Sequence, residues 1–296
     1  MKIGVDGGGT KTEIILIDDR GDIVARRTTG GCNPNSAGPE NARIILEEAL
    51  GTLAAHFPVS HTLLCMAGSP AFWRETVESL NAGGLFGSVS TLDDSRPVLE
   101  LATHGRPGLV LHAGTGSFVA AQAPDGSLHY AGGTGWRFGD PGSGYDIGRR
   151  AISKALLELQ GWQLPTSLST VVRDHTGLTH AAAITRHFYQ HAEPNKQIAA
   201  LAPALLRLAA EGDHAAHQIV AESITALLQL SEDVMTKLFP GWHRDTLRAG
   251  VSGPILTHAA VRPLLASRSS LHLRPIEEAP IEGVRRLLLR QPLTPP

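Results

Sequence analysis

The feature that most constrains the fold is a unit of three strands and two turns that occurs twice along the chain. The expected strands of the first copy are residues 2–5, 13–17 and 22–25, and those of the second are 108–113, 118–122 and 128–131. In both copies a small-residue turn separates the first two strands, and a polar turn precedes the third. An internal repeat of this kind predicts two similar lobes.

The first turn of each copy is rich in glycine, reading Asp6-Gly7-Gly8-Gly9-Thr10-Lys11-Thr12 in one and Gly114-Thr115-Gly116-Ser117 in the other. Glycine lacks a Cβ atom, so successive backbone N–H groups can crowd against a phosphate. A Walker-type loop is excluded because the first turn continues into a strand and not into a helix. A plain hairpin turn is the alternative, and the recurrence of the turn favours phosphate binding over it.

Length and charge narrow the class of protein. A chain of 296 residues is near the size at which a single core stops growing, which favours two domains. We place them at residues 1–107 and 108–296, with the last helix packing back on the first lobe. A formal net charge of −2 gives no support for a nucleic-acid or membrane partner, so a small-molecule substrate is expected.

The chain starts directly with a strand and contains no apolar run of spanning length, which predicts a cytoplasmic protein, expected as a homodimer. Cys32 and Cys65 have neither the spacing nor the histidine neighbours of a zinc site, and they predict no disulfide framework.

Apolar spacing predicts the remaining elements as an α/β fold with a helical insertion in the second lobe. In the first lobe we expect helices at 39–57, 70–81 and 97–104 and strands at 61–66 and 88–92. In the second we expect a helix that Ser143 caps, helices at 179–191, 196–210, 214–238, 255–265 and 280–290, and strands at 246–251 and 271–275.

Three separated motifs, Asp6–Thr12, Gly114–Ser117 and Gly139–Gly148, resemble those of the actin-like ATPase superfamily. More narrowly, they are similar to the family of N-acetylglucosamine kinases and BadF/BadG/BcrA/BcrD ATPases. The resemblance implies two RNase H-like lobes, ATP and Mg²⁺ as cofactors, and transfer of phosphate to N-acetylglucosamine, giving its 6-phosphate. It covers residues 1 to about 256.

The resemblance also assigns roles to residues. Asp6 would hold the Mg²⁺ ion of the nucleotide, and Asp94 would be the general base, with Asp93 as a weaker candidate. Either aspartate could instead cap the following helix. The nucleotide-binding residues would be Gly7, Gly8, Gly9, Thr10, Lys11, Thr12, Gly114, Thr115, Gly116, Ser117, Gly250 and Gly253.

The sugar contacts implied by the resemblance are Asn33, Asp94, Thr134 and Asp140. Two positions depart from the family pattern, because Pro141 stands where glutamate is usual and Thr134 where tryptophan is usual, with Trp136 two residues on. Both departures border the expected sugar pocket and leave the identity of the sugar open among N-acetylglucosamine, glucosamine, N-acetylmannosamine and glucose.

Other classes of protein fit less well. An activating ATPase of the same family would need paired cysteines for an iron–sulfur cluster, and this chain has two unpaired ones. A sugar-responsive repressor would need a DNA-binding domain before the first strand, and a filament protein would have no use for Asp94 and Asn33.

Overall fold

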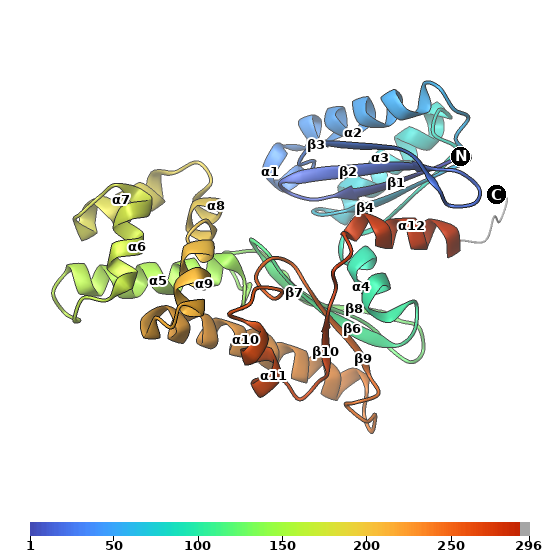
Figure 1. The fold of residues 1–296 in the computed structure, drawn as a ribbon. Helices are drawn as coiled ribbons and strands as arrows, with labels where there is room; N and C mark the ends of the chain where they lie inside the picture. The colour runs from blue at the N-terminus through green and yellow to red at the C-terminus, as the bar shows by residue number, and fades with distance from the viewer. Residues whose placement is uncertain (291–296) are drawn as a thin grey trace. The chain divides into compact units, whose positions relative to one another are not determined.

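The computed structural model describes residues 1–290, which form two compact units (Figure 1). Unit 1 comprises Met1–His104 together with residues 278–290, and unit 2 comprises Gly105–Glu277. Within residues 1–290, every helix is too short or too polar to span a lipid bilayer.

Unit 1 is built on a five-stranded mixed sheet in the order β3-β2-β1-β4-β5. Its strands are β1 (Lys2–Gly7), β2 (Lys11–Ile17), β3 (Ile23–Gly30), β4 (His61–Met66) and β5 (Ser88–Asp93). The first three strands form an antiparallel meander, and β4 and β5 run parallel to β1. The central strands are apolar on both faces because helices cover both faces.

One face of this sheet packs on α2 (Pro39–Ala54) and α3 (Pro70–Gly83), which follow the one-turn helix α1 (Pro34–Ala37). The other face packs on α12 (Pro280–Arg290), which lies beside α4 (Ser95–Thr103) (Figure 1). Gly4 permits this approach, since a Cβ atom there would lie 2.8 Å from Cγ1 of Val284. The last helix of the chain therefore belongs to the core of unit 1.

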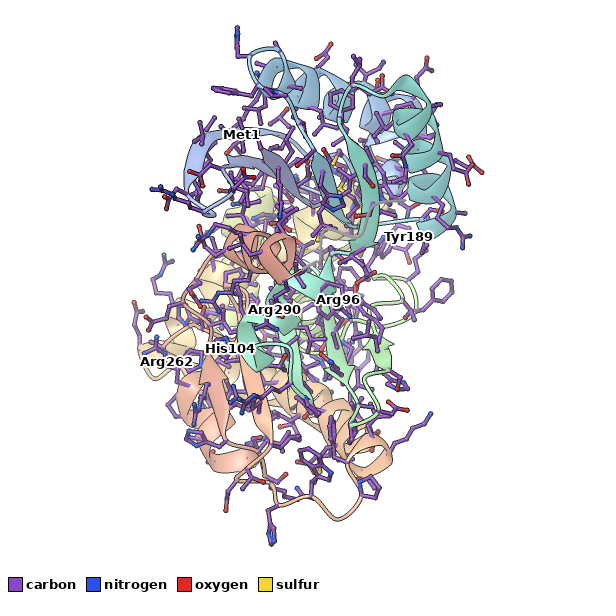
Figure 2. The ribbon with its side chains drawn as sticks, turned by 90° about the vertical axis from the view of Figure 1, so that its right-hand side faces the viewer. Met1, Arg96, His104, Tyr189, Arg262 and Arg290 are labelled. Carbon is purple, nitrogen blue, oxygen red and sulfur yellow. The ribbon has the colours of Figure 1, made fainter. Side chains whose placement is uncertain are left out.

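One ion pair and one hydrogen-bond contact join α12 to α4 and to His104, the residue that follows it; Figure 2 labels His104 and Arg290. Arg290 pairs with Glu100 at 2.9 Å, and Nη1 of Arg286 lies 3.2 Å from Nδ1 of His104. The two helices thus cover this part of unit 1 as one layer.

Unit 2 repeats the sheet of unit 1. Its strands are β6 (Gly108–Ala113), β7 (Ser117–Gln122), β8 (Leu128–Gly132), β9 (Arg248–Ser252) and β10 (Leu273–Pro275), in the order β10-β9-β6-β7-β8. Each strand takes the place of the strand five earlier in unit 1, with the same parallel and antiparallel neighbours. The duplication expected from the sequence is therefore confirmed at the level of strand order.

The helical insertion lies between β8 and β9. It contains α5 (Gly144–Leu159), α6 (Ser167–Thr176), α7 (Ala181–Gln190), α8 (Pro194–Ala199), α9 (Ala202–Ala210) and α10 (His214–Leu238). As expected, Ser143 caps α5, because its Oγ accepts a hydrogen bond of 3.1 Å from the N–H of Asp146. The long helix α10 packs on β7 and β8 and is part of the core of unit 2.

Three helix expectations were wrong in detail, and one helix was missed. The helix expected at 255–265 is absent: residues 253–261 form turns, and α11 (Arg262–Arg268) begins where Pro263 fits the first turn and could not fit a helix interior. Pro203 divides the expected helix 196–210 into α8 and α9 for the same reason. Helix α4 begins at Ser95, before the expected Pro97, and α6 had not been expected.

Candidate functional site

The candidate site residues of unit 1 lie in the loops at one edge of its sheet or at the ends of the strands next to those loops. Strands β1, β3, β4 and β5 all end at this edge, because β3 runs parallel to β1 through the meander. The loops are tightly packed: a Cβ atom at Gly31 would lie 2.3 Å from the carbonyl oxygen of Gly9, and one at Gly68 would lie 2.5 Å from Oδ1 of Asn33. Ligands of α/β sheets bind at the carboxyl ends of strands, which this edge provides.

Two carboxylates with raised pKa values mark this edge. Burial, and next the charge of Glu13, raise the pKa of Asp6 to about 6. Burial, then the charges of Asp93 and Asp6, raise the pKa of Asp94 to about 7. Two strand spacings, roughly 10 Å, separate the backbones of β1 and β5. The two carboxylates are therefore near enough to repel each other, and a cation would stabilise both in their charged form.

The structure separates the roles of the two adjacent aspartates. Oδ1 of Asp93 accepts a hydrogen bond of 2.9 Å from the N–H of Ser95, so Asp93 makes the local bond at the start of α4. Asp94 occupies the N-cap position itself, but its side chain makes no capping bond. The carboxylate of Asp94 is thus not needed for the helix.

Asn33 has one structural bond and one free group. Its Oδ1 accepts a hydrogen bond of 2.9 Å from the N–H of Asn35, which caps α1. Within residues 1–290 its amide nitrogen donates no hydrogen bond, so this half of the side chain is open to a ligand.

The first glycine turn is closed by a hydrogen bond of 3.0 Å from the N–H of Gly8 to the carbonyl oxygen of Lys11. Gly9 and Thr10 are exposed, and their N–H groups donate no hydrogen bond within residues 1–290. Thr12 is fully buried, and its hydroxyl donates to Sγ of Cys32 at 2.9 Å. The exposed donors of this turn are therefore at Gly9 and Thr10, while the Thr12 hydroxyl already has a partner.

In unit 2 the second glycine turn is joined to the loop that precedes α5. The N–H of Gly144 donates to the carbonyl oxygen of Gly114 at 2.8 Å, and that of Tyr145 donates to Thr115 at 3.2 Å. The hydroxyl of Ser117 donates to the carbonyl oxygen of Pro141 at 2.7 Å. The turn and the loop therefore form one rigid body, and the Ser117 hydroxyl holds it together.

Asp140 is the strained residue of that loop. Its backbone φ angle is +135°, a value that residues other than glycine rarely adopt. Burial raises its pKa to about 6, although N–H groups of Gly135 and Ser117 act against the rise. Its Oδ1 is buried without a hydrogen-bond partner within residues 1–290. A strained, buried acceptor with no partner is typical of a ligand contact.

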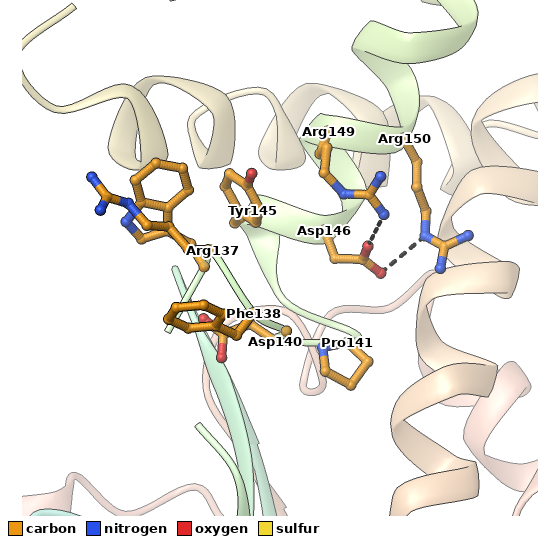
Figure 3. A pocket seen from close by; sticks show the side chains of 10 residues that line it. Arg137, Phe138, Asp140, Pro141, Tyr145, Asp146, Arg149 and Arg150 are labelled. Carbon is orange, nitrogen blue, oxygen red and sulfur yellow. Dashed lines mark hydrogen bonds and ion pairs between the residues drawn. The ribbon is translucent and has the colours of Figure 1, made fainter. Parts of the chain in front are cut away.

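A pocket of about 610 Å³ opens beside Asp140 (Figure 3). Its lining residues are Trp136, Arg137, Phe138, Gly139, Asp140, Pro141, Tyr145, Asp146, Arg149 and Arg150. Asp146 pairs with Arg149 at 2.9 Å and with Arg150 at 3.0 Å, so it orders the two arginines (Figure 3). Three aromatic and five charged side chains, around a pocket of this volume, suit a small polar ligand.

The prediction from the sequence did not include every residue of this lining. Trp136 and Tyr145 stand 5.5 Å apart between ring centroids, and Arg149 lies one helical turn on from Tyr145. Thr134, the expected sugar contact, is exposed and outside the lining, and Trp136 is in it. The signal that could have found Trp136 was its position two residues from the missing family tryptophan.

Gly250 and Gly253 belong to β9 and to the turn that follows it. Gly250 is a buried strand residue, in register with Val110 of β6 and Arg274 of β10. Gly253 has a φ angle of +87°, and a Cβ atom there would lie 2.3 Å from the carbonyl oxygen of Ala113. Only glycine fits at that position, so the turn after β9 can lie directly against the end of β6.

No group of three or more metal-binding side chains occurs within residues 1–290. A magnesium ion carried by a nucleotide needs only one or two protein carboxylates, because phosphates and water complete its coordination. Asp6 fits this requirement, since it is a largely buried carboxylate whose charge the nearby carboxylate of Glu13 disfavours.

Two copies of one mixed sheet, each with a glycine turn after its first strand, define a duplicated α/β protein of the actin-like ATPase fold. The chain belongs to the BadF/BadG/BcrA/BcrD ATPase family, whose model matches residues 3–239.

Similar proteins include an N-acetylmuramic acid/N-acetylglucosamine kinase of Clostridium acetobutylicum, 27% identical over 76% of each chain. An N-acetyl-D-glucosamine kinase of Dictyostelium discoideum is 27% identical over 80% of this chain and 79% of its own. A solved structure from Chromobacterium violaceum, described as a candidate N-acetylglucosamine kinase, is 27% identical, covers 98% of both chains and has a TM-score of 0.77.

Proposed function

We propose that this protein is an ATP-dependent amino-sugar kinase that phosphorylates N-acetylglucosamine or a close relative at the 6-hydroxyl. The observation that carries the proposal is the carboxylate of Asp94. It lies at the carboxyl end of β5, makes no capping bond, and has its pKa raised to about 7. A base with a pKa near the working pH accepts a proton most effectively from an attacking hydroxyl.

The remaining roles follow from the chemistry of each residue. The N–H groups of Gly9 and Thr10 in unit 1, and the Gly114–Ser117 turn in unit 2, would bind phosphate oxygens. Asp6 would hold Mg²⁺, which when bound neutralises charge on the phosphates. In this assignment Gly250 and Gly253 lie against the nucleotide, as do Gly7, Gly8 and the exposed side chain of Lys11.

For the sugar, the pocket of unit 2 offers the free Oδ1 of Asp140 as an acceptor for a hydroxyl and the rings of Trp136 and Tyr145 as apolar contacts. In unit 1, Asn33 offers its amide nitrogen. The names of the relatives from Clostridium acetobutylicum and Dictyostelium discoideum support an acetylated amino sugar as the acceptor.

The activating-ATPase alternative has less support from the structure. Cys32 and Cys65 are both fully buried in unit 1, and Cys32 accepts a hydrogen bond from Thr12. Ligands of an iron–sulfur cluster shared between subunits would have to reach the surface.

The test is ADP release with ATP and Mg²⁺ in the presence of N-acetylglucosamine, N-acetylmuramic acid, glucosamine, N-acetylmannosamine or glucose, each against a control without sugar. We expect ADP release to depend on an N-acetylated amino sugar. A rate that is the same with and without every sugar would contradict the proposal.

A further inference from the structure

The duplication assigns a counterpart to Asp6. Asp6 is the next-to-last residue of β1, and His112 is the next-to-last residue of β6, the strand that takes the place of β1 in unit 2. The neighbours correspond as well, because Asp6 is in register with Glu13 and Cys65, and His112 with Phe118 and Ser252. Where unit 1 has a carboxylate beneath its glycine turn, unit 2 has an imidazole.

The ring of His112 is held in one orientation. Its Nδ1 lies 2.8 Å from Oγ of Ser252, within hydrogen-bond distance. It stacks on Phe118, with ring centroids 5.0 Å apart and an angle of 18° between the planes. A Cβ atom at Gly253 would lie 3.1 Å from its Cε1, so the glycine leaves room for the ring. A fixed ring of this kind aims its other nitrogen in a defined direction.

That nitrogen, Nε2, has no partner. Within residues 1–290 it makes no hydrogen bond, and it lies 3.6 Å from where a Cβ atom of Gly114 would stand. The ring is mostly covered, and this burial lowers the pKa of His112 to about 4, so the imidazole stays neutral at physiological pH. If the Ser252 hydroxyl donates to Nδ1, the proton of the neutral ring is on Nε2.

We propose that His112 is a phosphate-contacting residue, whose Nε2–H donates a hydrogen bond to an oxygen of the nucleotide polyphosphate at the Gly114–Ser117 turn. This inference rests on the proposed function, because it takes ATP as the ligand. A carboxylate at this position would repel phosphate unless a cation lay between them, whereas a neutral donor attracts it directly.

Two variants distinguish the role of Nδ1 from the role of Nε2. His112→Asn can keep a hydrogen bond to Ser252, because its amide reaches the position of Nδ1, but it has nothing at Nε2. His112→Gln reaches the position of Nε2 and retains a donor there. Ser252→Ala is a third variant that removes only the group that orients the ring.

The measurement is binding of ATP, ADP and adenosine by calorimetry, with Mg²⁺ and with EDTA. Loss of a hydrogen bond to a charged phosphate should weaken ATP and ADP binding by about 10- to 100-fold in His112→Asn. Adenosine binding should not change, His112→Gln should recover most of the loss, and Ser252→Ala should show a smaller loss. The effect should persist in EDTA, because the contact is to phosphate and not to the metal.

Three results would overturn the inference: an unchanged ATP affinity in His112→Asn, an equal loss for ATP and adenosine, or a loss that disappears in EDTA. Should His112→Asn fail to fold, unchanged ATP affinity in Ser252→Ala, which removes the group that orients the ring, would have the same meaning. The wild-type protein separates this inference from the proposed function. If it binds ATP in the expected way but phosphorylates no amino sugar, only the function fails; if it is a kinase and His112→Asn binds ATP normally, only the inference fails.

Discussion

Replacing Asp94 by asparagine should lower the kcat of the enzyme and at the same time raise the stability of its fold. Asparagine has nearly the shape of aspartate but cannot accept the proton of the sugar hydroxyl, so kcat should fall by about 10²- to 10⁴-fold. The affinity for ATP should hardly change, because the base acts on the acceptor.

The stability gain follows from the raised pKa. The pKa of Asp94 is raised from 3.8 to about 7, first by burial and then by the charges of Asp93 and Asp6. A raised pKa favours the protonated folded state, so its stabilising effect is complete below pH 3.8 and is lost as the pH rises through 7. At pH 8, where the buried carboxyl is ionised, it costs the folded state about 4 kcal/mol. At pH 5.5, where the folded state must keep the group protonated, the cost is about 2 kcal/mol, and asparagine would recover at most these amounts.

The assay is urea unfolding of wild type and Asp94→Asn at pH 8 and pH 5.5, together with kcat. Asp93→Asn is the matched control, because its side-chain oxygen can still accept the hydrogen bond from Ser95. That variant should stay active, and the acidic limb of its pH–rate profile should move to lower pH, since one of the charges that raise the pKa of Asp94 is gone. A destabilised Asp94→Asn at pH 8, or one with near-wild-type kcat, would refute the reasoning.

Three further substitutions test other parts of the structure. Gly116→Val would place a Cβ atom 3.0 Å from Oδ2 of Asp140, and we expect calorimetry to show weaker ATP binding in a folded protein, whereas Gly83→Val, at an open position, should bind normally. Asp140→Asn removes the charge of a buried acceptor and should raise KM for the sugar by about 10-fold or more, with ATP affinity unchanged; an unchanged KM would contradict the sugar contact. Leu288→Ala opens a cavity between α12 and the sheet of unit 1 and should cost about 2 to 5 kcal/mol in urea unfolding, and a cost near zero would mean that α12 is not part of that core.

Much of the fold could be predicted because its signals are local and repeated. The two strand–turn–strand units, the strand His61–Met66 and the helix His214–Leu238 follow from apolar spacing and turn residues. The helix expected at 255–265 failed because the apolar spacing was given more weight than Pro263.

The site could be predicted less completely, because side-chain roles depend on three-dimensional contacts. Sequence alone left the capping role open between Asp93 and Asp94, and only the hydrogen bond to Ser95 assigns it to Asp93. Asp140 in the pocket lining has a backbone φ of +135°, which the sequence pattern did not predict. His112 could have been found from the sequence, since alignment of the two copies gives it the position in the second copy that Asp6 has in the first.

The central claim, phosphoryl transfer to the 6-hydroxyl of an amino sugar, is tested most directly by ³¹P NMR of the product formed from ATP, Mg²⁺ and N-acetylglucosamine. The account predicts a phosphate monoester whose phosphorus couples to the two protons on C6, formed by the wild type and nearly absent with Asp94→Asn. Release of inorganic phosphate at the same rate with and without sugar, and no phosphate ester, would contradict it.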